Sequence, residues 1–327
     1  MTSTVKNITV ADHAIGSDER VFIIAEAGVN HDGCTQQASD LVRAAKQAGA
    51  DAVKFQMFDA DELASSSAPA AAYQQKIGAR SQKRMLERLQ LDLHEMRDIV
   101  ACCQEAKIVF LATPFGVADV ENLAALNVPC VKIASTDINN RQLLKAAAEL
   151  HVPLIVSTGA ADEHEVRTAV DWLHAFAAAD HTILLHCISQ YPTPIHDANL
   201  RAIGALRDAF HLPVGFSDHT TSTQIGGLAV AAGACVLEKH MTLDRTAIGP
   251  DHAMSLEPEE LASYIAIVRE TERILGKSHF DMMPCEADVR RVARKSVVTR
   301  RLLKTGDVIT QDALTIKRPG TGIPPAE

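Results

Sequence analysis

The sequence has little of what marks nucleic-acid-binding or membrane-spanning proteins. Only 4% of its 327 residues are aromatic, and 32 Lys and Arg stand against 41 Asp and Glu, which gives a formal charge of -9 with no basic stripe. Nucleic acid is therefore not an expected partner, because its recognition needs clustered cationic and aromatic side chains. No run of about 18 apolar residues occurs, which argues against a membrane span.

Cysteine usage argues against a disulfide-stabilised secreted protein. The seven cysteines are odd in number and form no CxxC pair. Most of them sit in apolar runs, where cysteine usually acts as a small hydrophobic residue. The first residues, MTSTVKNITVADHAIG, lack the basic segment and apolar stretch of a signal peptide. We therefore expect a reduced, cytoplasmic protein.

Short apolar runs alternate with Ala-rich helical patterns, and this alternation predicts the fold. Eight such runs occur within about 250 residues, which is typical of a (β/α)₈ TIM barrel, an α/β fold. A doubly wound open sheet is the alternative, but it would not need eight repeats, and no GxGxxG follows the first run. The runs are Val21–Gly28, Asp51–Gln56, Ile108–Phe115, Cys130–Ser135, Pro153–Gly159, Thr182–Cys187, Pro213–Asp218 and Cys235–His240.

Composition shifts after Lys277, which predicts a second, smaller domain. We assign residues 1–277 to the barrel, 278–288 to a linker and 289–327 to a small β-rich module. The connection Met57–Leu91 is too long for a plain turn. Long loops on the catalytic face of a barrel are often lids or binding loops, but an inserted hairpin without a functional part explains it equally well.

Two histidines follow neighbouring predicted strands, His219 in GFSDHT and His240 in LEKH. Imidazoles at the ends of adjacent strands can share one divalent metal and leave positions open for water and substrate. A purely structural role for both histidines is the alternative. Asp218 and Glu238, which lie beside them in sequence, are expected to point to the opposite side of their strands and to form salt bridges or support the histidines.

The other strand ends carry lysines and hydroxyl groups, which suits a small, multiply charged anion. An alternative is that the lysines merely pair with Glu26, Asp137 or Glu238. Asp137 lies two residues beyond one of these hydroxyls and is a candidate general acid-base. The expected anion-binding residues are Lys54, Lys132, Ser135, Ser157, Ser189 and Ser217.

An ordered set of motifs between residues 22 and 322 resembles the sialic acid synthase family, which makes N-acylneuraminate, legionaminate and pseudaminate. The motifs are IIAEAGVNHDG, GADAVKFQ, TPFGVADV, VKIASTDINN, VSTG, LLHCISQYPTP, GFSDHT, LEKHMTLDR, GPDHAMSLEP and KRPGTGI. Any one of them is modest evidence, but the set in this order is highly specific.

The resemblance implies a metal-dependent transferase of the N-acetylneuraminate synthase type. Such an enzyme condenses phosphoenolpyruvate with an N-acylmannosamine-type sugar aldehyde and releases phosphate, as a step in making cell-surface polysaccharide. The anion site above would then hold phosphoenolpyruvate, and His219 and His240 would hold the metal, with Mn²⁺ the first expectation and Mg²⁺ or Zn²⁺ the alternatives. Asp137, His219 and His240 would be catalytic. By family position the sugar would contact Glu26, Gln56, Phe115, Tyr191 and Asp251.

The same resemblance implies an antifreeze-like (SAF) module at the C-terminus. In the family this module swaps across a homodimer, so Arg318 would bind the sugar's N-acyl group in the partner's site. Three features depart from the family pattern. Asp137 stands where several members have glutamate, Ser189 stands where some have asparagine, and the sequence ends at Glu327, so we expect a short or incomplete module.

Three other functions remain open. A phosphoenolpyruvate-dependent synthase acting on a phosphorylated sugar would need further Arg or Lys at the strand ends. A Schiff-base aldolase would use Lys54 or Lys132 as its nucleophile. A non-catalytic carbohydrate-binding protein would use the barrel as a scaffold. The sequence does not distinguish N-acetylmannosamine from a 6-deoxy diacetamido sugar as the acceptor.

Overall fold

The chain divides into two compact units, residues 1–276 and 277–327. The structure, a computed structural model, describes residues 6–65, 81–276, 280–318 and 322–327. No helix in these ranges is long and apolar enough to cross a membrane.

In the first unit, eight parallel strands close into a barrel, which confirms the predicted (β/α)₈ fold. Strands β3 to β10 follow one another around the ring, and β10 closes it by pairing with β3. Each predicted run coincides with one of them, with bounds that differ by no more than two residues. The strands are β3 (Phe22–Gly28), β4 (Ala52–Met57), β5 (Val109–Pro114), β6 (Val131–Ile133), β7 (Leu154–Ser157), β8 (Thr182–Cys187), β9 (Val214–Asp218) and β10 (Val236–His240).

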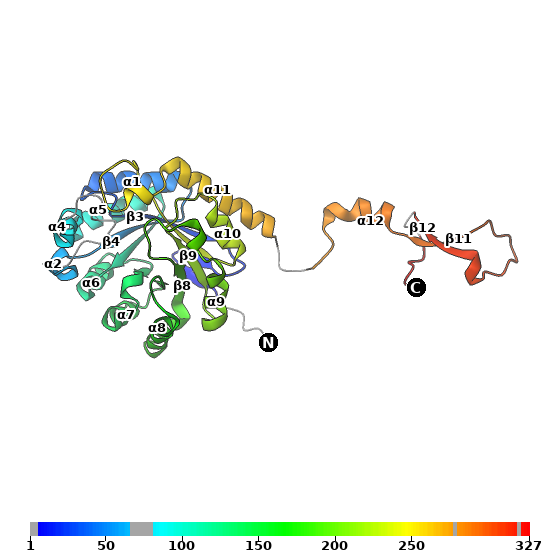
Figure 1. Ribbon diagram of the computed structural model, residues 1–327, viewed down its shortest axis with the longest axis horizontal. Coiled ribbons are helices and arrows are strands. Elements are labelled where there is room, and N and C mark those ends of the chain that lie inside the picture. Colours follow the sequence, from blue (N-terminus) through cyan, green and yellow to red (C-terminus); the bar gives the residue numbers. More distant parts are fainter. Residues whose placement is uncertain (1–5, 66–80, 277–279, 319–321) are drawn as a thin grey trace. The chain divides into compact units, whose positions relative to one another are not determined.

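Helices surround the strands (Figure 1). Their ends follow local sequence signals: Asp92 and Glu95 form a reciprocal capping box at the start of α5, and Gly49 adopts φ 95° just after α1. The helices are α1 (Thr35–Ala48), α2 (Ala60–Leu63), α4 (Gln82–Leu89), α5 (Leu93–Ala106), α6 (Val117–Ala125), α7 (Arg141–Ala148), α8 (Glu163–Ala175), α9 (Arg201–Phe210), α10 (Ile225–Ala231) and α11 (Pro258–Leu275).

The barrel interior changes from apolar to polar along its axis. Successive side chains of a strand point alternately inward and outward, so the inward residues form layers. The lower layers, toward the amino ends of the strands, form an apolar core that includes Phe22, Ile24, Leu111, Ile155 and Val236. The polar residues therefore gather near the carboxyl ends of the strands.

A short hairpin that we did not predict packs against this lower core. It consists of β1 (Ile8–Val10) and β2 (His13–Ile15), paired antiparallel. Ile8, Val10 and Ile15 are buried against the apolar lower layers of the barrel. Strands of three residues are too short to show a convincing two-residue alternation, which is why the sequence pattern did not predict them.

The second unit contains a helix and a two-stranded sheet. Helix α12 (Ala287–Ala293) precedes strands β11 (Ser296–Thr299) and β12 (Leu314–Lys317), which pair antiparallel. The stretch 278–288, which we assigned to a linker, includes a 3₁₀ turn at Pro284–Glu286 and the first residues of α12. The assignment of this unit to the antifreeze-like modules stays a prediction.

Candidate active site

A cavity of about 540 Å³ lies at the carboxyl ends of the barrel strands. The structure brings all the site residues predicted within the barrel to its lining, although they come from positions more than 200 residues apart. These residues are Glu26, Lys54, Gln56, Phe115, Lys132, Ser135, Asp137, Ser157, Ser189, Tyr191, Ser217, His219, His240 and Asp251.

Two lysines and two glutamates form the floor of this cavity. Lys54 Nζ lies 2.8 Å from Glu26 Oε2 and 3.7 Å from Glu238 Oε2, and it donates a hydrogen bond to Thr113 Oγ1 at 2.9 Å. Lys132 Nζ lies 3.7 Å from Glu238 Oε1. All four charged side chains are at most 5% exposed. The lysines therefore do pair with Glu26 and Glu238, which we gave as the alternative to an anion site. This pairing compensates the buried charges.

These carboxyl groups differ strongly in their proton affinity. Burial raises the pKa of Glu26 to about 7, although the Lys54 ammonium opposes the shift. Burial acts on Glu238 too, but Lys132 and Lys54 outweigh it and lower its pKa to about 2. Burial lowers the pKa of Lys132, whereas Glu238 and Glu26 raise that of Lys54 against the effect of burial. Glu238 is therefore ionised at neutral pH, whereas Glu26 takes up a proton near neutral pH.

The expected orientation of Glu238 was wrong. Its carboxylate points into the barrel, lines the cavity and accepts a hydrogen bond from Ser217 Oγ at 2.7 Å. Glu238 lies two residues before His240, so the two share a face of β10. Asp218 does point away from the cavity, as expected, because it lies one residue before His219.

Hydroxyl groups and a thiol line the side of the cavity next to Lys132. Ser135 Oγ accepts a hydrogen bond from the Gly159 amide at 3.0 Å and lies 3.6 Å from Cys187 Sγ. A side chain at Gly159 would clash with the hydroxyls of Ser189 and Ser135, so glycine permits this close approach. Ser157 Oγ is buried with no hydrogen-bond partner among the described residues. A buried hydroxyl without a partner, in a cavity that two lysines also line, fits a site whose ligand is an anion.

The two predicted metal-binding histidines lie together at the edge of this floor. Their ring centroids are 5.4 Å apart. His219 Nδ1 lies 2.7 Å from the Ile188 carbonyl oxygen, which can only accept, so Nδ1 holds a hydrogen and Nε2 is the nitrogen left for a cation. Burial opposes protonation of this ring, but the neighbouring Cys187 outweighs it and raises the pKa of His219. Burial, and next the neighbouring His219, hold the pKa of His240 well below its ordinary value, so this ring is neutral.

The histidine pair fits a divalent cation with several open positions. His240 Nδ1 is buried and has no hydrogen bond within the described residues, and Asp251 Oδ2 lies 3.9 Å from it. Burial raises the pKa of Asp251 to about 6. The described residues contain no group of three or more His, Cys, Asp or Glu arranged to hold a metal. Two imidazoles alone leave most coordination positions to water and substrate oxygens, as a substrate-binding metal requires.

Asp137 and Tyr191 complete the polar lining. Asp137 lies in the 3₁₀ turn Ser135–Asp137 after β6, where it accepts hydrogen bonds from Thr136 Oγ1 at 3.0 Å and Asn140 Nδ2 at 3.4 Å. Burial raises its pKa above the ordinary value. The Tyr191 ring packs against His219 with centroids 4.3 Å apart.

The mouth of the cavity is lined by apolar side chains from the long connection after β4. Met85, Leu86 and Leu89 on α4 and Leu63 on α2 line it. Phe115, which also lines the cavity, packs edge-on against Phe58 of the same connection, with centroids 6.1 Å apart. The described parts of Met57–Leu91 thus contribute to the site, whereas residues 66–80 lie outside the described residues. The sequence identified the insertion but not which of its residues would face the cavity.

Arg318 belongs to the second unit, where it follows β12. Its Nε donates a hydrogen bond to the Ala293 carbonyl at 2.9 Å. The expected contact of Arg318 with a partner's sugar stays a prediction.

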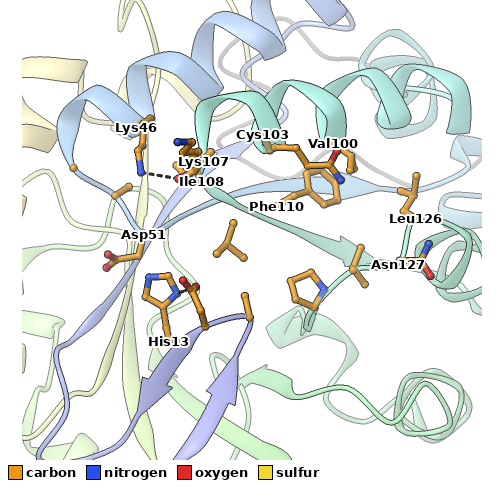
Figure 2. A pocket seen from close by; sticks show the side chains of 18 of the residues that line it. His13, Lys46, Asp51, Val100, Cys103, Lys107, Ile108, Phe110, Leu126 and Asn127 are labelled. Carbon is orange, nitrogen blue, oxygen red and sulfur yellow. Dashed lines mark hydrogen bonds and ion pairs between the residues drawn. The ribbon is translucent and has the colours of Figure 1, made fainter.

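A larger cavity, of about 720 Å³, lies at the opposite end of the barrel (Figure 2). Its lining includes His13 of the hairpin, Phe110 of β5, and Lys46, whose Nζ donates to the Lys107 carbonyl at 2.6 Å. It contains none of the predicted site residues. In (β/α)₈ barrels the reacting groups come from the carboxyl ends of the strands, so size alone does not make this cavity the active site.

Fold and cavity together define a (β/α)₈-barrel protein with a buried floor of paired lysines and glutamates beside a histidine pair. The chain belongs to the NeuB family, whose model matches residues 41–280. It is 42% identical to N,N'-diacetyllegionaminic acid synthase of Legionella pneumophila over 95% of this chain and 89% of that protein. It is 35% identical to N-acetylneuraminate-9-phosphate synthase of Mus musculus over 93% of this chain and 84% of that protein.

A solved structure agrees with this assignment. The crystal structure of the N-acetylneuraminic acid synthetase of Leptospira borgpetersenii, in complex with citrate, superposes with a TM-score of 0.80 at 35% identity. The match covers 88% of this chain and 96% of that one.

Proposed function

We propose that the protein is a nonulosonic acid synthase that condenses phosphoenolpyruvate with an N-acyl amino sugar aldehyde and releases phosphate. One observation carries the proposal: in a member of the NeuB family, a single cavity joins two buried lysines and a set of hydroxyls to a pair of histidines. The lysines suit the small anionic substrate, and the histidines suit a cation that would face the acceptor.

The anion would bind at the floor of the cavity. Lys54 and Lys132 supply fixed positive charge, and the hydroxyls of Ser135, Ser157 and Ser217 supply hydrogen-bond donors. In the absence of ligand, Glu238 and Glu26 balance the two lysines. A phosphate and a carboxylate would therefore meet an electrostatically prepared site in which the lysines are already held in place.

His219 and His240 would hold the divalent cation, with Mn²⁺ the first candidate and Mg²⁺ or Zn²⁺ the alternatives. When bound there, the cation would supply Lewis-acid polarisation of the acceptor's aldehyde group. The protein's own contribution is to present two imidazole rings at the ends of adjacent strands, one of them fixed by the hydrogen bond from His219 Nδ1 to Ile188 O.

The proposed reaction balances without a redox partner. A carbon–carbon bond forms between C3 of phosphoenolpyruvate and the aldehyde carbon, and the aldehyde oxygen takes up a proton. Water then adds to C2, the bond from C2 to the phosphate oxygen breaks, and phosphate leaves. Asp137, which lines the cavity with a raised pKa, would accept the proton of the attacking water.

Among the described residues, the cavity lining supports an acceptor without a phosphate group. The only Lys or Arg side chains there are Lys54 and Lys132, and both are paired with glutamates. The mouth is instead lined by Leu63, Met85 and Leu86, which favour methyl and acyl substituents. A 2,4-diacetamido-6-deoxy sugar fits these features, and an unphosphorylated N-acetylmannosamine is the second candidate. The higher identity to the legionaminic acid synthase than to the 9-phosphate synthase points the same way.

A homodimer belongs to the proposal. In it, the second unit would act as an antifreeze-like module and bring Arg318 to the partner's acceptor. A positively charged guanidinium that donates hydrogen bonds suits the carbonyl oxygen of an N-acyl group.

Phosphate release from phosphoenolpyruvate tests the proposed function. We expect release in the presence of Mn²⁺ only when an acceptor sugar is added, loss of release with EDTA, and recovery when Mn²⁺ is restored. His219→Ala should abolish it, while Lys107→Ala, at the other end of the barrel, should leave it unchanged. Acceptor-independent release or EDTA-resistant turnover would contradict the proposal.

One observation favours a Schiff-base aldolase as the alternative. Lys132 lines the cavity and burial lowers its pKa, as in lysines that attack carbonyl groups. Borohydride reduction in the presence of substrate separates the two mechanisms. A stable adduct at Lys132 would support the aldolase, and unmodified protein with full phosphate release would support the synthase.

A further inference from the structure

A buried ion pair lies just outside the barrel wall and has no part in the cavity. Lys239 Nζ lies 2.7 Å from Asp218 Oδ2, and neither side chain is exposed at all. The ammonium group also lies 5.6 Å from the centre of the Tyr264 ring on α11. Neither Lys239 nor Asp218 lines the cavity.

The position of this pair in the sheet links it to the histidines. Lys239 and Asp218 are direct partners in the parallel ladder of β10 and β9. Each is followed at once by one of the cavity histidines, His240 and His219. Because successive side chains alternate across a strand, the pair points outward and the imidazoles point inward. The outer pair thus joins the two strand ends at the level where the inner rings face each other.

Two further bonds hold the backbone on the far side of His219. Asp218 Oδ1 accepts a hydrogen bond from the Thr220 amide at 2.8 Å, and Lys239 Nζ also donates to the Thr220 carbonyl. The residues before and after His219 are therefore both tied to the residue before His240. The His219 carbonyl is fixed in turn by the amide of Thr193 at 2.9 Å.

Stability alone does not account well for such a pair. The cost of removing two charges from water usually offsets their attraction, and apolar residues of the same volume often serve a core equally well. What an ion pair adds is direction, because both charged groups must meet in one geometry. Metal sites need that precision, since ligands must be held to within about 0.5 Å of the productive arrangement.

We propose that Asp218 and Lys239 are positioning residues that set the separation of His219 and His240 for a divalent cation. This inference rests on the proposed metal site. It assigns a role to two residues that contact neither cation nor substrate, and it predicts that they act on metal affinity more than on folding.

Mn²⁺ binding to the metal-free full-length protein tests the assignment. The main variant is Asp218→Leu with Lys239→Met, which removes both charges and keeps an apolar filling. Asp218→Asn is the conservative variant, because its amide oxygen still accepts from Lys239. The matched control is Asp51→Asn, which weakens another largely buried ion pair, to Arg269 at 2.7 Å, at the opposite end of the barrel. Free Mn²⁺ is measured by electron paramagnetic resonance, and unfolding of each metal-free protein by circular dichroism.

We expect the double variant to stay folded and to bind Mn²⁺ about 10- to 100-fold more weakly, as for other residues that orient metal ligands. Asp218→Asn should fall between it and the wild type, and Asp51→Asn should lose stability without losing affinity. If the double variant does not fold, the Mn²⁺ affinity of Asp218→Asn is compared with that of the wild type instead. Affinity within twofold of the wild type in the folded variant overturns the positioning role alone. Absence of Mn²⁺ binding by the wild type, with His219→Ala no different, overturns the metal site and the positioning role with it.

Discussion

Lys54 Nζ lies 2.8 Å from Oε2 of Glu26 on the neighbouring strand, in a place where both side chains are at most 4% exposed. This buried contact joins the lysine that we propose as an anion ligand to the carboxyl group whose pKa is raised to about 7. An incoming anion would therefore act on the protonation of Glu26 as well as on Lys54.

Binding of phosphoenolpyruvate should be coupled to proton uptake. Glu26 is mostly ionised at pH 8, and a new anion nearby raises its pKa further, so the complex holds up to about one more proton than the free protein. Titration calorimetry at pH 8 in two buffers of different ionisation enthalpy measures this uptake. Glu26→Gln should remove it, and identical heats in both buffers for the wild type would contradict the account.

Asp137 should be required for turnover but not for binding of the anion. Asp137→Asn removes the proton acceptor and should lower kcat roughly 10²- to 10⁴-fold, with little change in the affinity for phosphoenolpyruvate. Asp137→Glu keeps a carboxyl group on a side chain one methylene longer and should retain most of the activity. Equal losses in both variants would show that packing, and not proton transfer, fixes this position.

Protonation of His31 should destabilise the fold between pH 6.5 and 4. Burial lowers the pKa of His31 to about 4, and its Nδ1 accepts a hydrogen bond from the Gly33 amide at 3.1 Å. As pH falls, the unfolded chain therefore binds the proton before the folded protein does. The stabilisation that comes from keeping His31 neutral is complete above pH 6.5 and is lost on acidification. The loss is about 3 kcal/mol.

His31→Asn provides the comparison, because its amide oxygen can replace Nδ1 as the acceptor. Urea unfolding at pH 7, 5.5 and 4 should show a smaller decline for the variant than for the wild type. Parallel declines would place the acid sensitivity elsewhere.

The apolar mouth of the cavity should govern acceptor choice. Leu86→Ala removes contact area on α4 and should lower kcat/KM for a 2,4-diacetamido-6-deoxy sugar by roughly 10-fold, with a smaller effect for N-acetylmannosamine. Leu228→Ala, at an exposed position on α10, is the control. Steady-state kinetics with both sugars checks this, and an equal loss for both would deny α4 a role in specificity.

The barrel and most of its polar lining could be predicted because both follow from strand alternation. An apolar run with a polar residue at its end specifies a buried strand and a side chain at the catalytic face, which is how Lys54, Lys132 and His219 were found. The same rule, applied with the correct spacing, would have placed Glu238 inside. Thr113 was missed although it follows Leu111 by two residues on β5 and lines the cavity.

Other features could not be predicted from local patterns. The side chains of α4 that face the cavity come from a short helix inside an insertion, so only the tertiary fold shows where its apolar face lies. Cys187 looked like a small core residue, yet it lies 3.7 Å from His219 Nδ1. The pairing of Lys239 with Asp218 depends on the register between β9 and β10, which no single segment encodes.

The most direct test of the proposed chemistry uses phosphoenolpyruvate labelled with ¹⁸O in the oxygen that bridges carbon and phosphorus. The protein is incubated with Mn²⁺ and the 6-deoxy diacetamido sugar, and the ¹⁸O content of the released phosphate is measured by mass spectrometry. Cleavage of the carbon–oxygen bond predicts that the label leaves with phosphate and that no phosphate appears without the sugar. Unlabelled phosphate, or release without an acceptor, would show that the cavity hydrolyses a phosphate ester and does not form a carbon–carbon bond.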